Sequence, residues 1–263
     1  MESKKTDRLY KEKLNNQGCL MKIIEYNNNR DIIVEFQDDY RATIHTSYQN
    51  FLIGEVKNPY HHEVFDIGMI GVKYPAKING KNTKEYTAWY SMIERCYYEK
   101  YKEQRPTYED ATCCEDWLLY ENFYEWLHSQ ENFDKWYHGI KWTLDKDIIN
   151  KRNKVYSPEK CCLVPMSVNN LFTKSDIARG DLPIGVTYHK RIGKYHAKIS
   201  KLGKNGKYRE HIGYYATVEK AFYAYKQAKE HYIKQVAQTE YSNSNITEEC
   251  YNAMMNYIVE ITD

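Results

Sequence analysis

The sequence predicts an α+β protein with three folded parts: an N-terminal small β-barrel, a central ββα region with flanking helices, and a C-terminal three-stranded sheet plus a helix. Three observations predict this class. Short apolar runs at hairpin spacing fill residues 18–75. Apolar residues at helical spacing begin only after residue 84. Alternating apolar and polar residues between glycine turns mark residues 185–214, and an amphipathic helical stripe follows them.

The length of the chain agrees with several domains. Its 263 residues correspond to about two or three domains of ordinary size. The charged start and the absence of a long apolar run favour a cytoplasmic protein with no membrane partner. Seven cysteines without a secretory signal predict reduced thiols. We expect a flexible arm at 1–17, a β-barrel-like domain at 18–75, a ββα domain with flanking helices at 84–178, a sheet-and-helix domain at 182–237 and an acidic tail helix at 238–263.

The first folded part is predicted to be entirely β. Residues 20–24, 32–36 and 42–44 are apolar runs of strand length, and Asn-rich or Asp-rich turns separate them. Frequent Gly and Pro residues between Gly54 and Pro75 favour the tight corners of a small barrel over a helix. We expect this part to supply DNA or protein contacts rather than chemistry.

The middle of the chain is predicted to contain helices first and then two strands. A stripe of apolar residues over 89–97 predicts an amphipathic helix, and residues 121–130 predict a second one. Residues 140–144 and 161–164 have the character of strands. Pro165 ends the second strand, and a short helix is expected after it.

The last folded part has the clearest pattern. Alternation over residues 185–214, with turns at Gly193 and 203–206, predicts three antiparallel strands. Thr217 is a typical helix N-cap, and an apolar stripe follows it. Lys229 falls within that stripe, where its aliphatic stem can lie along apolar neighbours.

Charge is concentrated near the end of the chain. Residues 182–237 carry twelve Lys or Arg and three Asp or Glu, which gives +9, whereas 238–263 carry five acidic and no basic residues. A basic segment of this size predicts a polyanion partner, and double-stranded DNA is the leading candidate; the alternative is a solvated lysine-rich surface. Strand alternation places polar residues on the sheet face away from the helix. The candidate DNA contacts are Lys194, His196, Lys198, Arg209 and His211 on that face, with Tyr188, Lys190 and Arg191 at its edge.

Two stretches of this basic segment carry a family resemblance. GVTYHKRIGKYHAKIS and REHIGYYATVEKAFYAY follow one another within about 55 residues. Together they resemble the plant ethylene-response-factor (APETALA-type) DNA-binding domain, which also occurs in phage and mobile-element endonucleases. The resemblance implies a sheet that enters a DNA groove. This chain lacks the arginine-rich first strand and the sheet tryptophan of that family.

Four motifs in the middle of the chain carry a second resemblance. Trp-x-x-Met-x-x-Arg-Cys stands at 89–96, Leu-Asp at 144–145, Tyr-Ser-Pro-Glu-x-Cys at 156–161 and Asn-Asn at 169–170. In this order they resemble the phage HNH endonucleases, so that the region 84–178 is expected to be an HNH-like domain. The resemblance implies a ββα site around one divalent metal that stabilises the transition state of DNA cleavage.

The resemblance also implies the metal ligands. Asp145 would bind the ion together with Asn169 or Asn170, and Asp147 is a further candidate ligand. Carboxylate and amide oxygens are the hard ligands that Mg²⁺ prefers. We therefore expect Mg²⁺ or another divalent metal as the cofactor if the chain is catalytic.

The catalytic base is the position where this chain departs from the HNH pattern. Lys146, beside Asp145, occupies the place of the histidine that activates water. A lysine is ordinarily protonated near neutral pH, so it is a poor general base. His128 and His138 are the nearby candidates for a replacement.

Two further interpretations remain open at the level of the sequence. The adjacent cysteine pairs 113–114 and 161–162 lack the Cys-x-x-Cys spacing of zinc sites, so structural zinc is not favoured. The leading functional prediction is a DNA-binding protein with a degenerate HNH site and metal-dependent nicking. The alternative is a non-catalytic, phage-type inhibitor that binds and blocks a host defence nuclease or another nucleic-acid machine in the host cytoplasm.

Overall fold

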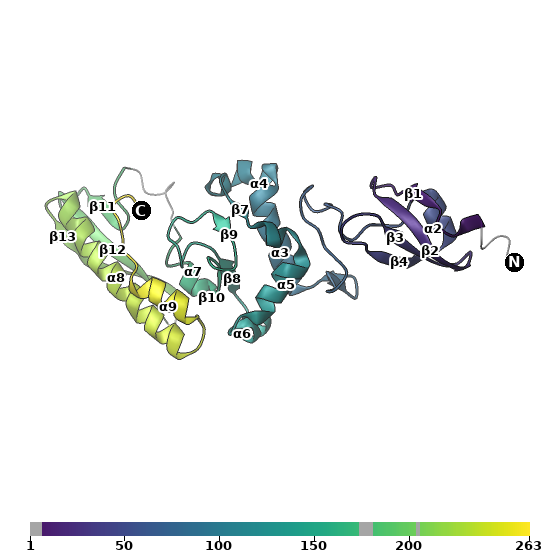
Figure 1. Ribbon diagram of the computed structural model, residues 1–263. Coiled ribbons are helices and arrows are strands. Elements are labelled where there is room, and N and C mark those ends of the chain that lie inside the picture. Colours follow the sequence, from purple (N-terminus) through teal and green to yellow (C-terminus); the bar gives the residue numbers. More distant parts are fainter. Residues whose placement is uncertain (1–6, 174–180, 204–205) are drawn as a thin grey trace. The chain divides into compact units, whose positions relative to one another are not determined.

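The computed structural model describes residues 7–173, 181–203 and 206–263, in a mixed α+β fold (Figure 1). The chain divides into two compact units, residues 1–127 and 128–263, and each is described by itself. Among the described residues, no helix is long and apolar enough to cross a membrane.

An antiparallel sheet of four strands forms the N-terminal part of the first unit. Its order is β1 (Glu12–Leu14), β2 (Leu20–Asn28), β3 (Asp31–Phe36) and β4 (Thr43–Thr46). Alternation along β3 puts its apolar side chains on one face, where Ile32, Val34 and Phe36 are fully buried. Met21 and Ile23 of β2 pack in the same core.

The expected β-barrel is wrong, because this sheet stays open. The chain after β4 turns into helix α2 (Tyr48–Ile53) instead of another strand. The Ser47 side chain caps that helix by accepting the N–H of Asn50, and Gly54 ends it at a φ of +74°. Phe51 then anchors the helix in the core of the sheet.

The flexible arm expected at residues 1–17 is wrong for residues 12–17, which belong to the N-terminal sheet and its first turn. Residues 1–6 lie outside the described part of the chain. Residues 12–14 form the edge strand β1, which pairs with β2 in the register Lys13↔Met21. Asn15 fixes the turn that follows, because its Oδ1 accepts the N–H groups of Gln17 and Cys19.

The rest of the first unit is mainly helical. The helix predicted from the apolar stripe is confirmed as α3 (Lys84–Tyr97), and its buried side chains include Trp89, Met92 and Ile93. The Trp89 indole donates to the carbonyl of Trp117 at 2.7 Å. The other elements are β5 (Lys77–Ile78), β6 (Lys81–Asn82), α4 (Glu99–Gln104), β7 (Thr112–Cys113), α5 (Tyr120–Ser129) and the 3-10 helices η1 (Pro106–Tyr108) and η2 (Glu115–Leu118).

A buried carboxylate fixes the long loop of this unit. Glu121 of α5 is 2% exposed, and its Oε1 accepts the backbone N–H groups of Val72 and Lys73 at 2.5 and 2.7 Å. Gly71 permits this approach, because a Cβ at that position would lie 2.2 Å from Glu121 Oε1 and its φ is +82°. The Tyr60 hydroxyl lies 3.4 Å from the same carboxylate.

The second unit begins with the strands and short helix predicted in the middle of the chain. Strands β8 (Trp142–Asp145) and β10 (Cys162–Pro165) pair antiparallel in the register Leu144↔Leu163. Helix α7 (Met166–Asn169) follows β10 directly. The remaining elements are α6 (Phe133–His138) and β9 (Val155–Tyr156).

The predicted three-stranded sheet and helix are confirmed at the C-terminal end. The antiparallel order is β11 (Val186–His189), β12 (Lys194–Gly203) and β13 (Gly206–Tyr215), and the sheet packs on α8 (Val218–Ser242). Ala197 and Ile199 are fully or almost fully buried against the helix residues Ala221 and Phe222. Residues 204–205 of the expected glycine turn lie outside the described part of the chain.

Helix α8 joins two cores of the second unit. Its first turns pack on the sheet, and its later residues Ile233 and Ala237 pack with Val164 and Val168 of β10 and α7. Helix α9 (Glu248–Met255) covers the same second core with Cys250. The pair of strands, the short helix and the C-terminal sheet are therefore held by one long helix.

The acidic end of the chain is also packed within this unit. Lys151 Nζ lies 2.7 Å from a carboxylate oxygen of Asp263 and 3.1 Å from Glu260, and Arg152 lies 2.8 Å from Glu260. The tail therefore neutralises a basic loop between β8 and β10.

Candidate nucleic-acid interface and the ββα region

The C-terminal sheet sorts its side chains onto two faces. Directly paired residues share a face, and Val186 with Ala197 lies on the face that packs against α8. The next pairs along the strands therefore project from the opposite face, which we call the free face. The cross-strand pairs on it are Thr187↔His196, His196↔Tyr214, Lys198↔His211, Ser200↔Arg209 and Leu202↔Lys207.

Acidic charge is absent from this free face in the described strands. Glu210 is the one acidic residue within β11–β13, and it lies opposite Ile199 on the helix side. There it pairs with Lys201 at 2.9 Å. The charges of Lys198, Lys207 and Arg209 are consequently not neutralised by a carboxylate of the described sheet.

An imidazole cluster occupies the middle of the free face. His196 Nε2 lies 2.7 Å from His211 Nδ1, and both rings lie within 5 Å of the Tyr214 ring between centroids. The His189 ring also meets Tyr214, and its Nδ1 is buried without a hydrogen-bond partner among the described residues. Burial, followed by the neighbouring charges of His211 and Lys198, lowers the pKa of His196.

The other predicted DNA contacts do not all lie on the same side of the sheet. Lys190 and Arg191 are exposed in the turn between β11 and β12, and Lys194 begins β12 opposite His189. Tyr188 instead pairs with Tyr195, and the two rings lie 5.2 Å apart. Since Tyr195 packs toward the helix, Tyr188 lies on the helix side and not with the free face.

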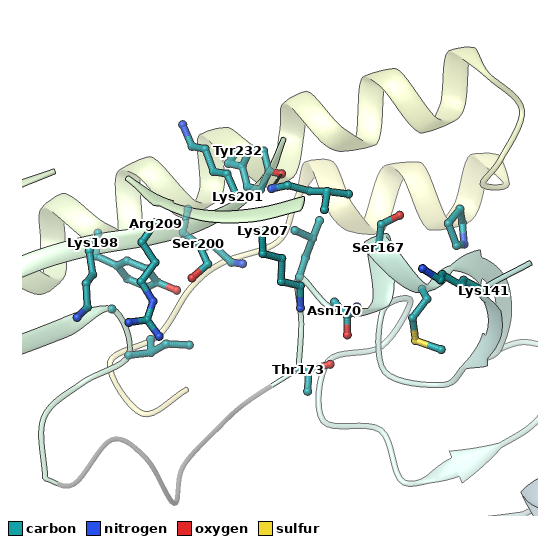
Figure 2. Close-up of a pocket in the computed structure, with 18 of the residues that line it drawn as sticks. Lys141, Ser167, Asn170, Thr173, Lys198, Ser200, Lys201, Lys207, Arg209 and Tyr232 are labelled. Atoms are coloured by element: carbon teal, nitrogen blue, oxygen red, sulfur yellow. Dashed lines mark hydrogen bonds between the residues drawn. The ribbon is translucent and has the colours of Figure 1, made fainter. Parts of the chain in front are cut away.

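A cavity that sequence reasoning missed lies at the start of β11, where β12 continues past Ala197 without β11 as a partner. Its volume is about 940 Å³. Residues of β12, β13 and α8 line it together with residues around β8 and α7 (Figure 2). Lys198 and Arg209 line one end of it, so the cavity adjoins the free face. Lys229, a cation in the middle of an apolar helical stripe, is the sequence signal that could have indicated it.

In the ββα region, the Asp145 side chain accepts hydrogen bonds from the backbone of the turn that follows it. It is 8% exposed at the end of β8, and its Oδ1 accepts the backbone N–H groups of Asp147 and Ile148 at 2.7 and 2.8 Å. Burial raises the pKa of this carboxyl, although the two N–H donors act in the opposite direction. The side chain thus closes the turn that leaves β8.

Lys146 is likewise occupied by its own loop. It is 6% exposed, and its Nζ donates to Asp147 Oδ1 at 2.7 Å and to the carbonyl of Asn153 at 2.8 Å. The Asn153 amide donates back to the Lys146 carbonyl at 2.9 Å. These bonds lock the loop between β8 and β9 and give the ammonium group two acceptors.

The other predicted site residues have contacts of their own. The His128 ring stacks on Phe133, with centroids 3.9 Å apart, and His138 meets the Tyr137 ring. Asn169 ends α7, and Asn170 lines the cavity. Within the described residues, no group of three or more His, Cys, Asp or Glu side chains could hold a metal ion.

The cysteine pairs 113–114 and 161–162 lie in different units and have different neighbours. Cys113 Sγ lies 3.6 Å from the hydroxyl of Tyr97, and Cys162 packs beside Cys250 in the core of the second unit. All seven cysteines are free thiols. The hydrogen bond with Cys250, followed by burial, raises the pKa of Cys162, so it is an inert core thiol.

No family model, curated protein or solved structure matches this chain. We therefore infer function from the arrangement of charge on the free face and around the cavity.

Proposed function

We propose that this chain binds double-stranded DNA through the free face of the β11–β13 sheet. The observation that carries the proposal is the sorting of charge in this sheet. Lys194, Lys198, Lys207 and Arg209 belong to one face, whereas Glu210 lies on the other and pairs with Lys201. A face with several cations and no described carboxylate is suited to a row of phosphates.

The width and chemistry of the face also suit a duplex. A narrow antiparallel sheet can enter a DNA groove, where Arg and Lys bind guanine edges or phosphates. His196, His211 and Tyr214 add hydrogen-bonding groups at the centre of the same surface. The proposal agrees with the resemblance of this segment to the ethylene-response-factor domain.

The test is duplex binding by the full chain at several salt concentrations. Binding should weaken steeply between about 50 and 200 mM salt, because phosphate contacts release counterions. Arg209→Ala should weaken binding and lower the slope of log K against log salt by about one. Lys234→Ala removes the same charge from the exposed side of α8 and should leave both quantities unchanged.

Two outcomes of this titration would contradict the proposal. One is the absence of a salt-dependent shift, which would leave a role in binding a host protein as the better explanation. The other is an equal loss of affinity in the Arg209→Ala and Lys234→Ala variants, since this would indicate attraction by net charge without a defined face.

We further propose that the ββα region is a scaffold that has lost metal-dependent cleavage. The order of β8, β10 and α7 agrees with the HNH resemblance. The side chains present do not fit a divalent ion, because Asp145 closes a turn and the Lys146 ammonium is bonded to Asp147. An ammonium that close to the ion would repel it strongly.

A plasmid-nicking assay with Mg²⁺ or Mn²⁺ tests this second proposal. The native chain should cleave no faster than the Asp145→Asn variant, which keeps an oxygen acceptor for the turn while removing the negative charge. Cleavage that disappears in Asp145→Asn but persists in Lys146→Ala would refute the proposal, and it would identify His128 or His138 as the candidate base.

A further inference from the structure

We propose that the cavity beside β12 is a binding site for a nucleoside phosphate. This inference goes beyond duplex binding by the free face, and it does not depend on it. The ligand is either a free nucleotide or an unpaired nucleotide of a nucleic-acid strand. Both present the same chemistry, namely a phosphate attached to a nucleoside with a planar base.

The charge of the lining favours an anion. Six Lys or Arg residues line the cavity, and no Asp or Glu stands among its described lining residues. Lys201 is neutralised by Glu210. The other five form no ion pair with any residue that the structure describes, and they are Lys141, Lys198, Lys207, Arg209 and Lys229.

The position of Lys229 indicates an occupant more strongly than the surface cations do. It projects from α8 into the cavity beside Tyr225 and Tyr232, and the described residues give it no hydrogen-bond partner. Burial alone lowers its pKa to about 8. A half-buried cation without a counter-charge is costly, and a phosphate group would supply that charge.

The arrangement of the side chains fits the two halves of a nucleotide. Lys198 and Arg209 are diagonal neighbours on the sheet and lie at one end of the cavity, and Lys207 extends toward Asn170 (Figure 2). Trp142 and Met166 contribute apolar surface elsewhere in the lining. Flat apolar surface suits a base, and the cations suit its phosphates.

Gly185 packs closely against Tyr225 at the start of β11, and both residues line the cavity. Gly185 has a φ of +79°, and a Cβ there would lie 2.1 Å from the Tyr225 ring. Its carbonyl accepts the N–H of Lys198 at 3.0 Å, which is where the ladder between β11 and β12 stops. The backbone of β12 beyond this point borders the cavity.

Calorimetric titration of the full chain with ADP tests the site, with adenosine and pyrophosphate as matched probes. ADP should bind more tightly than either probe. Lys229→Met keeps the aliphatic stem and removes the charge, and it should weaken ADP binding about ten-fold, as expected for one lost charge-assisted hydrogen bond. Lys207→Met should weaken it as well.

A blunt DNA duplex and the same duplex with a single-stranded overhang separate the two sources of nucleotide. If a strand supplies the ligand, Lys229→Met should weaken binding of the overhang duplex but not of the blunt one. Lys194→Met, whose side chain does not line the cavity, should weaken the blunt duplex and leave ADP binding intact. Failure of duplex binding is thereby distinguished from failure of the cavity site.

Three results would overturn the inference. The first is the absence of an effect of Lys229→Met on both ADP and the overhang duplex. The second is equal affinity for pyrophosphate and ADP, which would mean that the nucleoside is not recognised. The third is equal weakening of the blunt and overhang duplexes by Lys229→Met without ADP binding.

Discussion

Replacing Glu121 by Ala is expected to destabilise the first unit by about 3 kcal/mol, since two backbone N–H groups would lose the buried carboxylate that accepts them. Those donors are Val72 and Lys73, which lie on the Oε1 atom of a side chain that is 2% exposed. Among the described residues of this loop, the Tyr60 hydroxyl makes the other contact with the carboxylate. Thermal and denaturant unfolding of the full chain measure the effect.

Glu121→Gln is the matched control for this substitution. It retains an oxygen acceptor of nearly the same shape, so it should lose much less stability than Glu121→Ala. Hydrogen exchange gives a local reading, because the amides of Val72 and Lys73 should exchange faster in the Ala variant than in the Gln variant. Equal exchange rates in both variants would show that the carboxylate does not hold the loop.

Replacing Lys229 by Met is expected to stabilise the second unit at pH 7 by about 3 kcal/mol. Burial lowers the pKa of Lys229 from 10.5 to about 8. Each pKa unit corresponds to about 1.4 kcal/mol of preference for the neutral form. Met retains the aliphatic packing along α8 and removes the cost of burying an ammonium group.

The stability difference between Lys229→Met and the native chain should depend on pH in one direction. Between about pH 8 and 10.5 the unfolded chain binds the Lys229 proton and the folded chain does not, so the stability of the native protein rises through this window. Below pH 8 both the folded and the unfolded chain bind the Lys229 proton, so the full cost of burying the ammonium group remains. The advantage of Lys229→Met should therefore be constant below pH 8 and shrink toward pH 10.5.

Unfolding of both proteins in the same buffers isolates this effect, because all other titrating groups are common to the two chains. Phosphate and nucleotides should be left out, since an anion in the cavity would offset the cost of the ammonium group. A Met variant that is less stable than the native chain at pH 7 would show that the ammonium has a compensating partner.

Elements with a regular period could be predicted from the sequence. The stripe from Trp89 to Cys96 gave α3, and the alternation from Tyr195 to Ser200 gave β12 with its helix-facing and free sides. In both cases local spacing and burial of one face point to the same structure. The free face of the sheet was predictable for the same reason.

Features that depend on the ends of elements were harder to predict. Ser47 caps α2 with a single hydrogen bond. The chain continues into this helix and not into a further strand, so the N-terminal sheet is open. Tyr188 was placed at the edge of the DNA face, but its pairing with Tyr195 fixes it on the other side. Which strand residues pair is decided by the whole sheet.

The hydrogen-bond partners of a long side chain could not be predicted from its position in a motif. Lys146 stands beside Asp145, yet its ammonium group bonds to Asp147 and to the carbonyl of Asn153. The cavity was invisible for a related reason, since Trp142, Asn170 and Lys229 meet only after α8 has packed on two cores.

Helix α8 has a mechanical consequence for any duplex bound to the sheet. Its 25 residues form a rod of about 37 Å at 1.5 Å per residue. One end is fixed in the core of the sheet and the other in the core shared with β10 and α7. Both cores are thus joined by a rigid element and not by a loose linker. If a duplex binds the free face as proposed, the core around β10 and α7 would be held at a fixed distance from it.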